Sequence, residues 1–111
     1  MIKHKNNLQH GSTRVIVFKE SNEWYAVALE LNIVESGTNS REAMLLLFEA
    51  ISGYIEAAQK KKASSLILNQ ASDEEYEKLW QRLQEHKKPK NKEVFFFGEH
   101  NLVEDKNFAP A

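Results

Sequence analysis

Residues 24–44 read WYAVALELNIVESGTNSREAM and change from the period of a strand to the period of a helix. The first part alternates, so one face of a strand would carry the larger residues Tyr25, Val27 and Leu29. The opposite face holds Trp24 and two alanines, and its small residues favour a helix packed closely against it. Residues 32–36 predict a short third strand, which Gly37 interrupts.

A long helix is predicted from Ser40 to about Lys60. Asn39, followed three residues later by Glu42, is typical of a helix N-terminus, because the asparagine side chain can accept a hydrogen bond from an amide of the first turn. Apolar residues then recur at three- and four-residue spacings and form one broad stripe: Ala43, Leu47, Ala50, Ile51, Tyr54, Ile55 and Ala58.

The residues before Trp24 predict the first strand of a hairpin, whose second strand begins at Trp24. Residues 15–18 are a compact β-branched and aromatic run, and the turn-forming group 21–23 follows them. Residues 1–12 are polar, so we expect a flexible N-terminal arm. A single domain would then span residues 13–100.

The chain after the long helix predicts a second, shorter helix and a later strand. Ser72 and Glu75 have the spacing of a capping box, and one side of the helix would carry Tyr76, Leu79, Trp80 and Leu83. Residues 93–97 predict a strand that is fully buried or lies in an interface, because three adjacent rings cannot all occupy one face of a sheet. From Gly98 we expect irregular structure, with residues 101–111 as a C-terminal tail.

Length and composition fit one domain. The chain has 111 residues, of which 41% are hydrophobic, and this is enough for one core. The 15 basic and 16 acidic residues leave a net charge of -1, so no overall field attracts nucleic acid or membrane. Cysteine is absent, which excludes disulfides and thiolate zinc sites. No apolar run approaches the ~20 residues of a membrane span, and we expect a cytoplasmic protein without membrane contact.

These elements together resemble the HicB-like antitoxin family over residues 14–58. The positions that carry the resemblance are Gly37, Asn39, Glu42, Ala43, Glu49, Ala50, Ile51 and Tyr54. The resemblance implies an α+β, partial ribonuclease-H-like fold: a three-stranded antiparallel sheet plus a later strand, packed on a long helix, with a second shorter helix. It also implies an antitoxin of a toxin-antitoxin system that neutralises a small HicA-type ribonuclease by direct protein-protein contact. The alternative is a standalone RNA- or protein-binding module without a toxin partner.

The family's DNA-binding module has no counterpart here. Antitoxins that repress their own operon carry paired recognition helices, and the segment after Lys62 offers one helix followed by an aromatic strand. We therefore expect weak or absent binding to duplex DNA. This chain also has Leu31-Asn32 where many members have Pro-Gly before the third strand.

Two basic clusters are candidate contacts to nucleic acid. Their lysines are Lys60, Lys61, Lys62, Lys87, Lys88 and Lys90. Both clusters follow predicted helices, where cations complement the helix dipole, and we favour this interpretation over phosphate contact because the chain as a whole is not basic.

No catalytic, metal or cofactor site is expected, and we predict that the protein is not an enzyme. The four histidines, His4, His10, His86 and His100, have no pair at a spacing of four residues. The acids Glu20, Glu23, Glu30 and Glu35 fall in predicted turns and strand ends, and we interpret them as solvated.

A homo-oligomer, most simply a dimer, is predicted through Val94, Phe95, Phe96 and Phe97. Helices on only one face of the sheet would leave the other face uncovered, and that face carries Phe18, Tyr25, Val27 and Leu29. Pairing across a two-fold axis would bury it. Stacking of the phenylalanine rings on nucleic-acid bases is the alternative, which the flanking Glu93 and Glu99 disfavour.

Overall fold

The computed structural model describes residues 6–7, 10–89 and 91–102. Its elements are β1 (Ser12–Glu20), β2 (Glu23–Ala28), β3 (Ile33–Gly37), α1 (Ser40–Lys60), a 3₁₀ helix (Ser65–Leu68), α2 (Glu74–Gln84) and β4 (Glu93–Asn101). The strands form one antiparallel sheet in the order β3-β2-β1-β4. The predicted α+β class is confirmed, with the three strands, the long helix, the shorter helix and the later strand that the sequence indicates.

Helix α1 covers one face of the sheet, as the small residues of β2 predict. Ala26 and Ala28 are fully buried there, beside Val15 and Val17 of β1. From α1 the residues Ala43, Leu47, Ile51 and Ile55 enter the same cluster. Four of the seven residues of the predicted stripe therefore meet the sheet in this cluster, and Ala58 at the end of the stripe is also buried.

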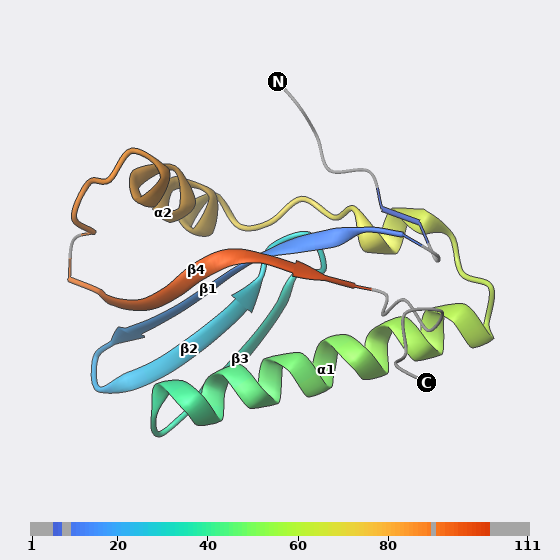
Figure 1. The fold of residues 1–111 in the computed structure, drawn as a ribbon, viewed down its shortest axis with the longest axis horizontal. Coiled ribbons are helices and arrows are strands. Elements are labelled where there is room, and N and C mark those ends of the chain that lie inside the picture. The colour runs from blue at the N-terminus through green and yellow to red at the C-terminus, as the bar shows by residue number, and fades with distance from the viewer. Residues whose placement is uncertain (1–5, 8–9, 90, 103–111) are drawn as a thin grey trace, which may run out of the picture.

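Helix α2 covers the opposite face, so the prediction that both helices share one face is wrong. In Figure 1 the sheet lies between α1 and α2. Leu79 and Leu83 of α2 pack against a second cluster of sheet residues, Ile16, Phe18, Val27 and Leu29, all of which are at most 2% exposed. The chain reaches this face through the 3₁₀ helix, which the sequence analysis did not anticipate. The sheet face that we expected a second copy to cover is already covered from within.

The N-terminus of α1 has the predicted cap. Asn39 Oδ1 accepts a hydrogen bond from the amide of Glu42 at 2.8 Å, and Glu42 Oε1 accepts one from the amide of Thr38 at 2.7 Å. Gly37 is required by a close approach, since a Cβ at this position would lie 2.9 Å from the amide nitrogen of Ala43. β3 can therefore run directly against the start of the helix.

The N-terminus of α2 differs from the prediction. The helix begins at Glu74 after Asp73, whose side chain makes no capping hydrogen bond. The hydroxyl of Ser72 donates to Glu77 Oε2 at 2.6 Å. The predicted capping box of Ser72 and Glu75 is therefore wrong, because the serine is recruited by a different carboxylate.

β4 is an edge strand that pairs with β1 and continues to Asn101, further than the sequence predicts. A bulge opposite Val17 and Phe18 leaves Phe95 as the extra residue. Phe95 meets Trp24 edge to face at 6.3 Å, and Phe97 meets Trp80 edge to face at 5.8 Å. Trp24 belongs to the cluster under α1 and Trp80 to the cluster under α2, so the rings occupy both faces as predicted. They are not fully buried.

The described part of the expected N-terminal arm contacts the 3₁₀ helix. Asn6 is 6% exposed and donates through Nδ2 to the carbonyl oxygen of Leu68 at 2.7 Å. Its amide donates to Asn69 Oδ1 at 2.7 Å, and its own Oδ1 accepts from the amide of Ser12 at 2.8 Å. Residues 1–5 and 8–9 of this arm, and residues 103–111 of the tail, lie outside the described residues.

Candidate functional site

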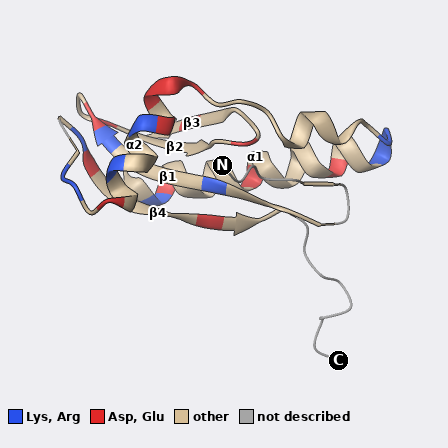
Figure 2. Cartoon of the chain, turned by 90° about the horizontal axis from the view of Figure 1, so that it is seen from above, with Lys and Arg blue, Asp and Glu red and all other residues tan. Residues whose placement is uncertain are grey.

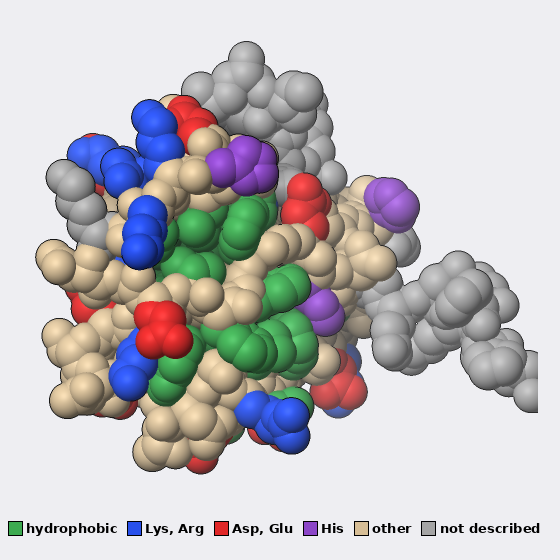
Figure 3. All heavy atoms as spheres, turned by 60° about the vertical axis from the view of Figure 1, so that its left-hand side comes forward, with side chains coloured by type: hydrophobic (Ala, Val, Ile, Leu, Met, Phe, Trp, Pro, Cys, Tyr) green, Lys and Arg blue, Asp and Glu red, His purple; other side chains and the backbone are tan. Residues whose placement is uncertain are grey.

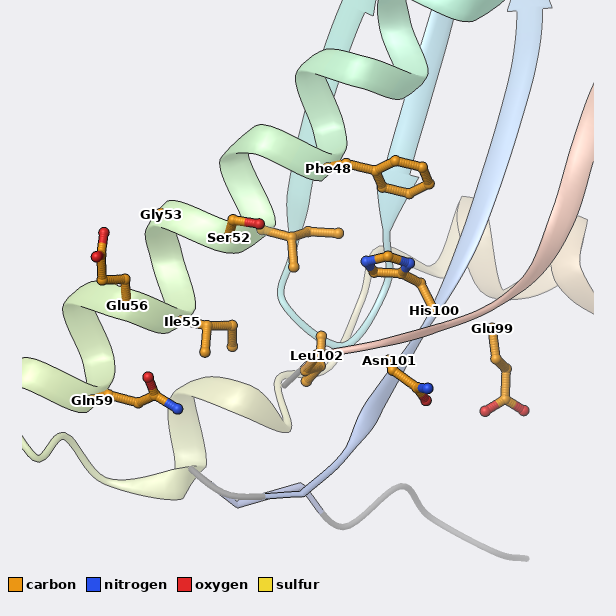
Figure 4. A pocket seen from close by; sticks show the side chains of 11 residues that line it. Phe48, Ser52, Gly53, Ile55, Glu56, Gln59, Glu99, His100, Asn101 and Leu102 are labelled. Carbon is orange, nitrogen blue, oxygen red and sulfur yellow. The ribbon is translucent and has the colours of Figure 1, made fainter. Parts of the chain in front are cut away.

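A groove of about 810 Å³ lies between the second half of α1 and the end of β4. Its α1 wall includes Phe48, Ser52, Ile55 and Glu56, and its other wall is formed by residues 99–102 (Figure 4). Helix α1 packs mainly on β1, β2 and β3 and covers the α1-side face of β4 only in part, through Phe48. We call this feature the α1–β4 groove.

Two aromatic rings line the α1–β4 groove, one from each side. Phe48 and His100 stack with ring centroids 4.5 Å apart and planes inclined by 13° (Figure 4). Burial against this ring disfavours a charged imidazole and lowers the pKa of His100 below its usual 6.5. A neutral histidine therefore adds a flat, weakly polar surface to the apolar residues Ile55 and Leu102.

One carboxylate stands at the margin of the groove. It belongs to Glu56 of α1, which is exposed, whereas the side chain of Glu99 lies on the same side of the sheet as its β1 neighbour Arg14, the α2 side. Glu99 Oε1 accepts a hydrogen bond from the hydroxyl of Ser12 at 2.9 Å, which fixes one of its oxygens. The groove thus combines aromatic, aliphatic and acidic groups. This chemistry suits the binding of an apolar segment that carries positive charge.

The most buried ionic group is one that the sequence analysis missed. Glu30 is 4% exposed, and the prediction that it is solvated is wrong. Its Oε1 accepts from the amide of Arg14 at 2.7 Å, and its Oε2 accepts from Nε of Arg14 at 2.7 Å. The other side of the guanidinium donates to both carboxylate oxygens of Glu77, at 2.8 and 2.7 Å. The only sequence signal was a charge placed between the apolar residues Leu29 and Leu31.

Electrostatics in this network favour a charged guanidinium. Burial alone would lower the pKa of Arg14, but the hydrogen bond to Glu77 and the charges of Glu30 and Glu77 outweigh it, so the net effect raises the pKa. Arg14 also lies over the ring of Trp80, 5.6 Å from its centroid. One arginine thereby pairs with two carboxylates and joins β1 to α2.

The remaining acids and histidines considered from the sequence are not brought together. Glu20 accepts from Lys92 at 3.3 Å, while Glu23 is exposed in the hairpin. His10 and His86 are exposed, and His4 lies outside the described residues. Across residues 6–7, 10–89 and 91–102, no three of the histidines and acids are grouped in a way that would hold a metal ion.

The two lysine clusters lie at opposite ends of the molecule (Figure 2). Lys60, Lys61 and Lys62 are exposed where α1 ends, with Lys60 in its last turn. Lys87 and Lys88 follow α2, and Lys87 pairs with Glu85 at 3.1 Å. Lys90 lies outside the described residues. Because these clusters do not meet in one basic surface, the preferred interpretation as helix-end charge fits their positions.

The predicted interface residues lie on the sheet edge. Val94 is half-buried on the α2 side, whereas Phe95, Phe96 and Phe97 are 54%, 39% and 37% exposed. Figure 3 shows hydrophobic side chains gathered in the middle of one face of the molecule, with charged side chains around them. We call residues 94–97 the aromatic edge.

Within the part of the chain that the structure describes, no helix has both the length and the apolar character needed to cross a membrane. Comparisons with models of protein families, with curated proteins and with solved structures found no match to this chain.

Proposed function

We propose that this chain is a non-catalytic binding protein of the antitoxin type, which holds a basic partner protein in the α1–β4 groove. The observation that carries the proposal is the groove itself, which combines the stacked rings of Phe48 and His100 with the carboxylate of Glu56. A small ribonuclease must be basic to bind RNA, and an acidic protein surface is a complementary partner for such an enzyme.

The resemblance to HicB-like antitoxins supports the same function. The residues that carry it form the end of β3, the cap of α1 and the apolar side of α1, namely Gly37, Asn39, Ala43 and Ile51 among others. Of these residues, Ile51 also lines the α1–β4 groove. As part of this proposal, the chain has a partial ribonuclease-H-like, HicB-like fold and a cytoplasmic location. Its partner is a HicA-type toxin.

A non-catalytic role fits the state of the carboxylates. A general acid or base needs a carboxylate within reach of a substrate. Both oxygens of Glu30 accept hydrogen bonds from the protein's own Arg14, and Glu20 is engaged by Lys92. A standalone module that binds single-stranded RNA is the competing function, because the exposed phenylalanine rings of the aromatic edge offer stacking surfaces. The acids Glu93 and Glu99 beside these rings repel phosphate and favour a protein partner.

The proposal is tested with the product of the adjacent gene. A neighbouring reading frame should encode a small basic protein with a catalytic histidine, whose expression arrests growth and whose co-expression with this chain restores it. In binding measurements with that purified protein, Ser52→Arg on the groove wall should weaken affinity at least about tenfold by adding bulk and positive charge.

Ala57→Arg is the matched control, since it adds the same side chain to an exposed position of α1 that does not line the groove. Its affinity should stay within about twofold of the unmodified chain. A basic neighbour that neither binds this chain nor is neutralised by it would contradict the proposal. Tight binding of single-stranded RNA by this chain alone would favour the competing function.

A further inference from the structure

We propose that two copies of this chain pair antiparallel along β4, about a two-fold axis that sets Phe97 opposite Phe97 of the second copy. This goes beyond the proposed function, which places a different protein in the α1–β4 groove. β4 forms an edge of the sheet and exposes phenylalanine rings there. Its charged residues restrict the register in which a second copy of the strand can pair with it.

β4 is an edge strand of the sheet. Among the described residues, this nine-residue strand pairs with β1 on one side and with no strand on its other side. Residues 93–101, EVFFFGEHN, contain none of the lysine or proline that often prevents self-pairing, while Glu93, Glu99 and the bulge at Phe95 restrict where a second strand can pair. The other edge strand, β3, has five residues and is shielded by its short length.

The aromatic edge gives the pairing an apolar component on both faces of the sheet. A phenylalanine buries roughly 150–250 Å² when fully covered, so exposed fractions of 54%, 39% and 37% leave roughly 250 Å² of ring surface per copy. This is less than half of a standard interface, and the backbone ladder must supply much of the rest. We therefore expect a weak dimer whose dissociation constant is about micromolar.

The register follows from the charges and side-chain sizes of β4. An axis at Phe97, the midpoint of the strand, places Phe96 opposite Gly98, and the bulge at Phe95 limits regular pairing to this central part of the strand. The ring of Phe96 already lies over Gly98 of its own strand, where a Cβ would be 2.9 Å from it, so an aromatic ring fits the bare backbone at this position.

Neighbouring registers are less favourable. An axis at Phe96 would set Glu93 opposite Glu99 of the second copy, and an axis at Glu99 would set two Glu99 side chains against each other. An axis at Gly98 would put no side chain at the centre of the pair. With the axis at Phe97, the two Phe97 rings and the two Trp80 rings would lie together on the α2 side, since Phe97 and Trp80 are already in contact.

The absence of cysteine from the chain makes this register directly testable. Directly opposed residues in an antiparallel pair have Cα atoms roughly 4.5–5.5 Å apart, within the range that a disulfide spans. Phe97→Cys should form a covalent dimer on mild oxidation at about 100 µM, well above the expected dissociation constant. Phe95→Cys is the control, because its residue is more exposed but lies two positions from the axis.

Sedimentation equilibrium of the unmodified chain supplies the second measurement, since Phe97→Cys itself removes a ring from the interface. The unmodified chain should be a dimer at about 100 µM, and Phe96→Lys, with an unchanged circular dichroism spectrum, should be a monomer. A monomeric unmodified chain at this concentration would overturn the proposal. So would a dimer that persists in Phe96→Lys, or faster cross-linking of Gly98→Cys than of Phe97→Cys.

Discussion

Arg14 holds Glu30 at two points, through its backbone amide and through Nε, each at 2.7 Å. The same guanidinium donates to Glu77 of α2, and the hydroxyl of Thr13 donates to Glu30 Oε1 at 3.2 Å. Three segments that are far apart in the sequence therefore depend on one side chain. The network ties α2 to the sheet and makes the α2-side cluster part of one cooperative core.

Glu30→Ala should lower the free energy of unfolding by about 3 kcal/mol, because it leaves the partly buried Arg14 without one of its two carboxylates. Urea denaturation followed by circular dichroism measures this change. Glu23→Ala is the control, since Glu23 is exposed in the hairpin and should change stability by no more than about 0.5 kcal/mol. Equal stabilities of the two variants would show that the network contributes nothing.

Asn39→Ala should lower the free energy of unfolding by about 1 kcal/mol, because it removes the acceptor for the amide of Glu42 at the start of α1. Asp73→Ala should cost only about 0.3–0.5 kcal/mol, since Asp73 makes no capping hydrogen bond and acts only through the dipole of α2. Thermal unfolding of both variants gives the comparison. A larger loss for Asp73→Ala than for Asn39→Ala would contradict this ranking of the two caps.

Lowering the pH should destabilise the folded protein, because His100 becomes protonated. Its pKa is lowered in the folded protein by burial, so the folded state binds fewer protons than the unfolded state. The free energy of unfolding is therefore highest, with respect to this group, above pH about 6.5, the pKa of His100 in the unfolded chain. It decreases as the pH falls toward the lower pKa of His100 in the folded protein. Between pH 7.5 and 5.5, the melting temperature of His100→Gln should fall less than that of the unmodified chain.

The groups in contact with His100 carry no charge that changes in this range. Phe48 stacks on it from α1, Thr13 lies opposite it on β1, and neither changes charge between pH 5.5 and 7.5. Glu56 lines the same groove, and Glu99 precedes His100 in β4. His86→Gln is the control, because His86 is exposed beyond the end of α2. If His86→Gln flattens the pH profile as much as His100→Gln does, the assignment to His100 is wrong.

RNA incubated with the purified chain and Mg²⁺ or Mn²⁺ should stay intact. Glu30 is engaged by Arg14, Glu20 is engaged by Lys92, and the two acids belong to different networks, so they offer no shared site for a metal ion. Gel electrophoresis of a labelled transcript provides the measurement. Metal-dependent cleavage that disappears in Glu20→Gln or Glu30→Gln would contradict the prediction.

Local patterns in the sequence predicted the elements on the α1 side of the molecule. The alternation from Trp24, the cap at Asn39 and the stripe from Ala43 to Ala58 each depend on neighbours within a few residues, and the structure has the hairpin, the third strand and α1 at these places. The alanines of β2 also indicated the face on which α1 packs. Such signals are readable because strand and helix periods are properties of the local chain.

Features that depend on distant partners could not be predicted. Helix α2 packs on the face of the sheet opposite α1 because Phe18, Val27 and Leu29 are apolar and are buried there. The sequence indicates that these residues must be buried, but it does not indicate which segment covers them. The burial of Glu30 depends on Arg14, 16 residues earlier. The α1–β4 groove follows from the placement of β4 beside β1, which no local pattern specifies.

Each face of the sheet carries its own fluorophore. The chain has two tryptophans, and Trp24 packs in the cluster under α1 while Trp80 packs in the cluster under α2. Trp24→Phe would leave an emission signal that reports the docking of α2, and Trp80→Phe would leave one that reports the packing of α1. Each indole also touches a ring of the aromatic edge, so the same two variants would show spectroscopically which side of the molecule responds first when β4 acquires a neighbour.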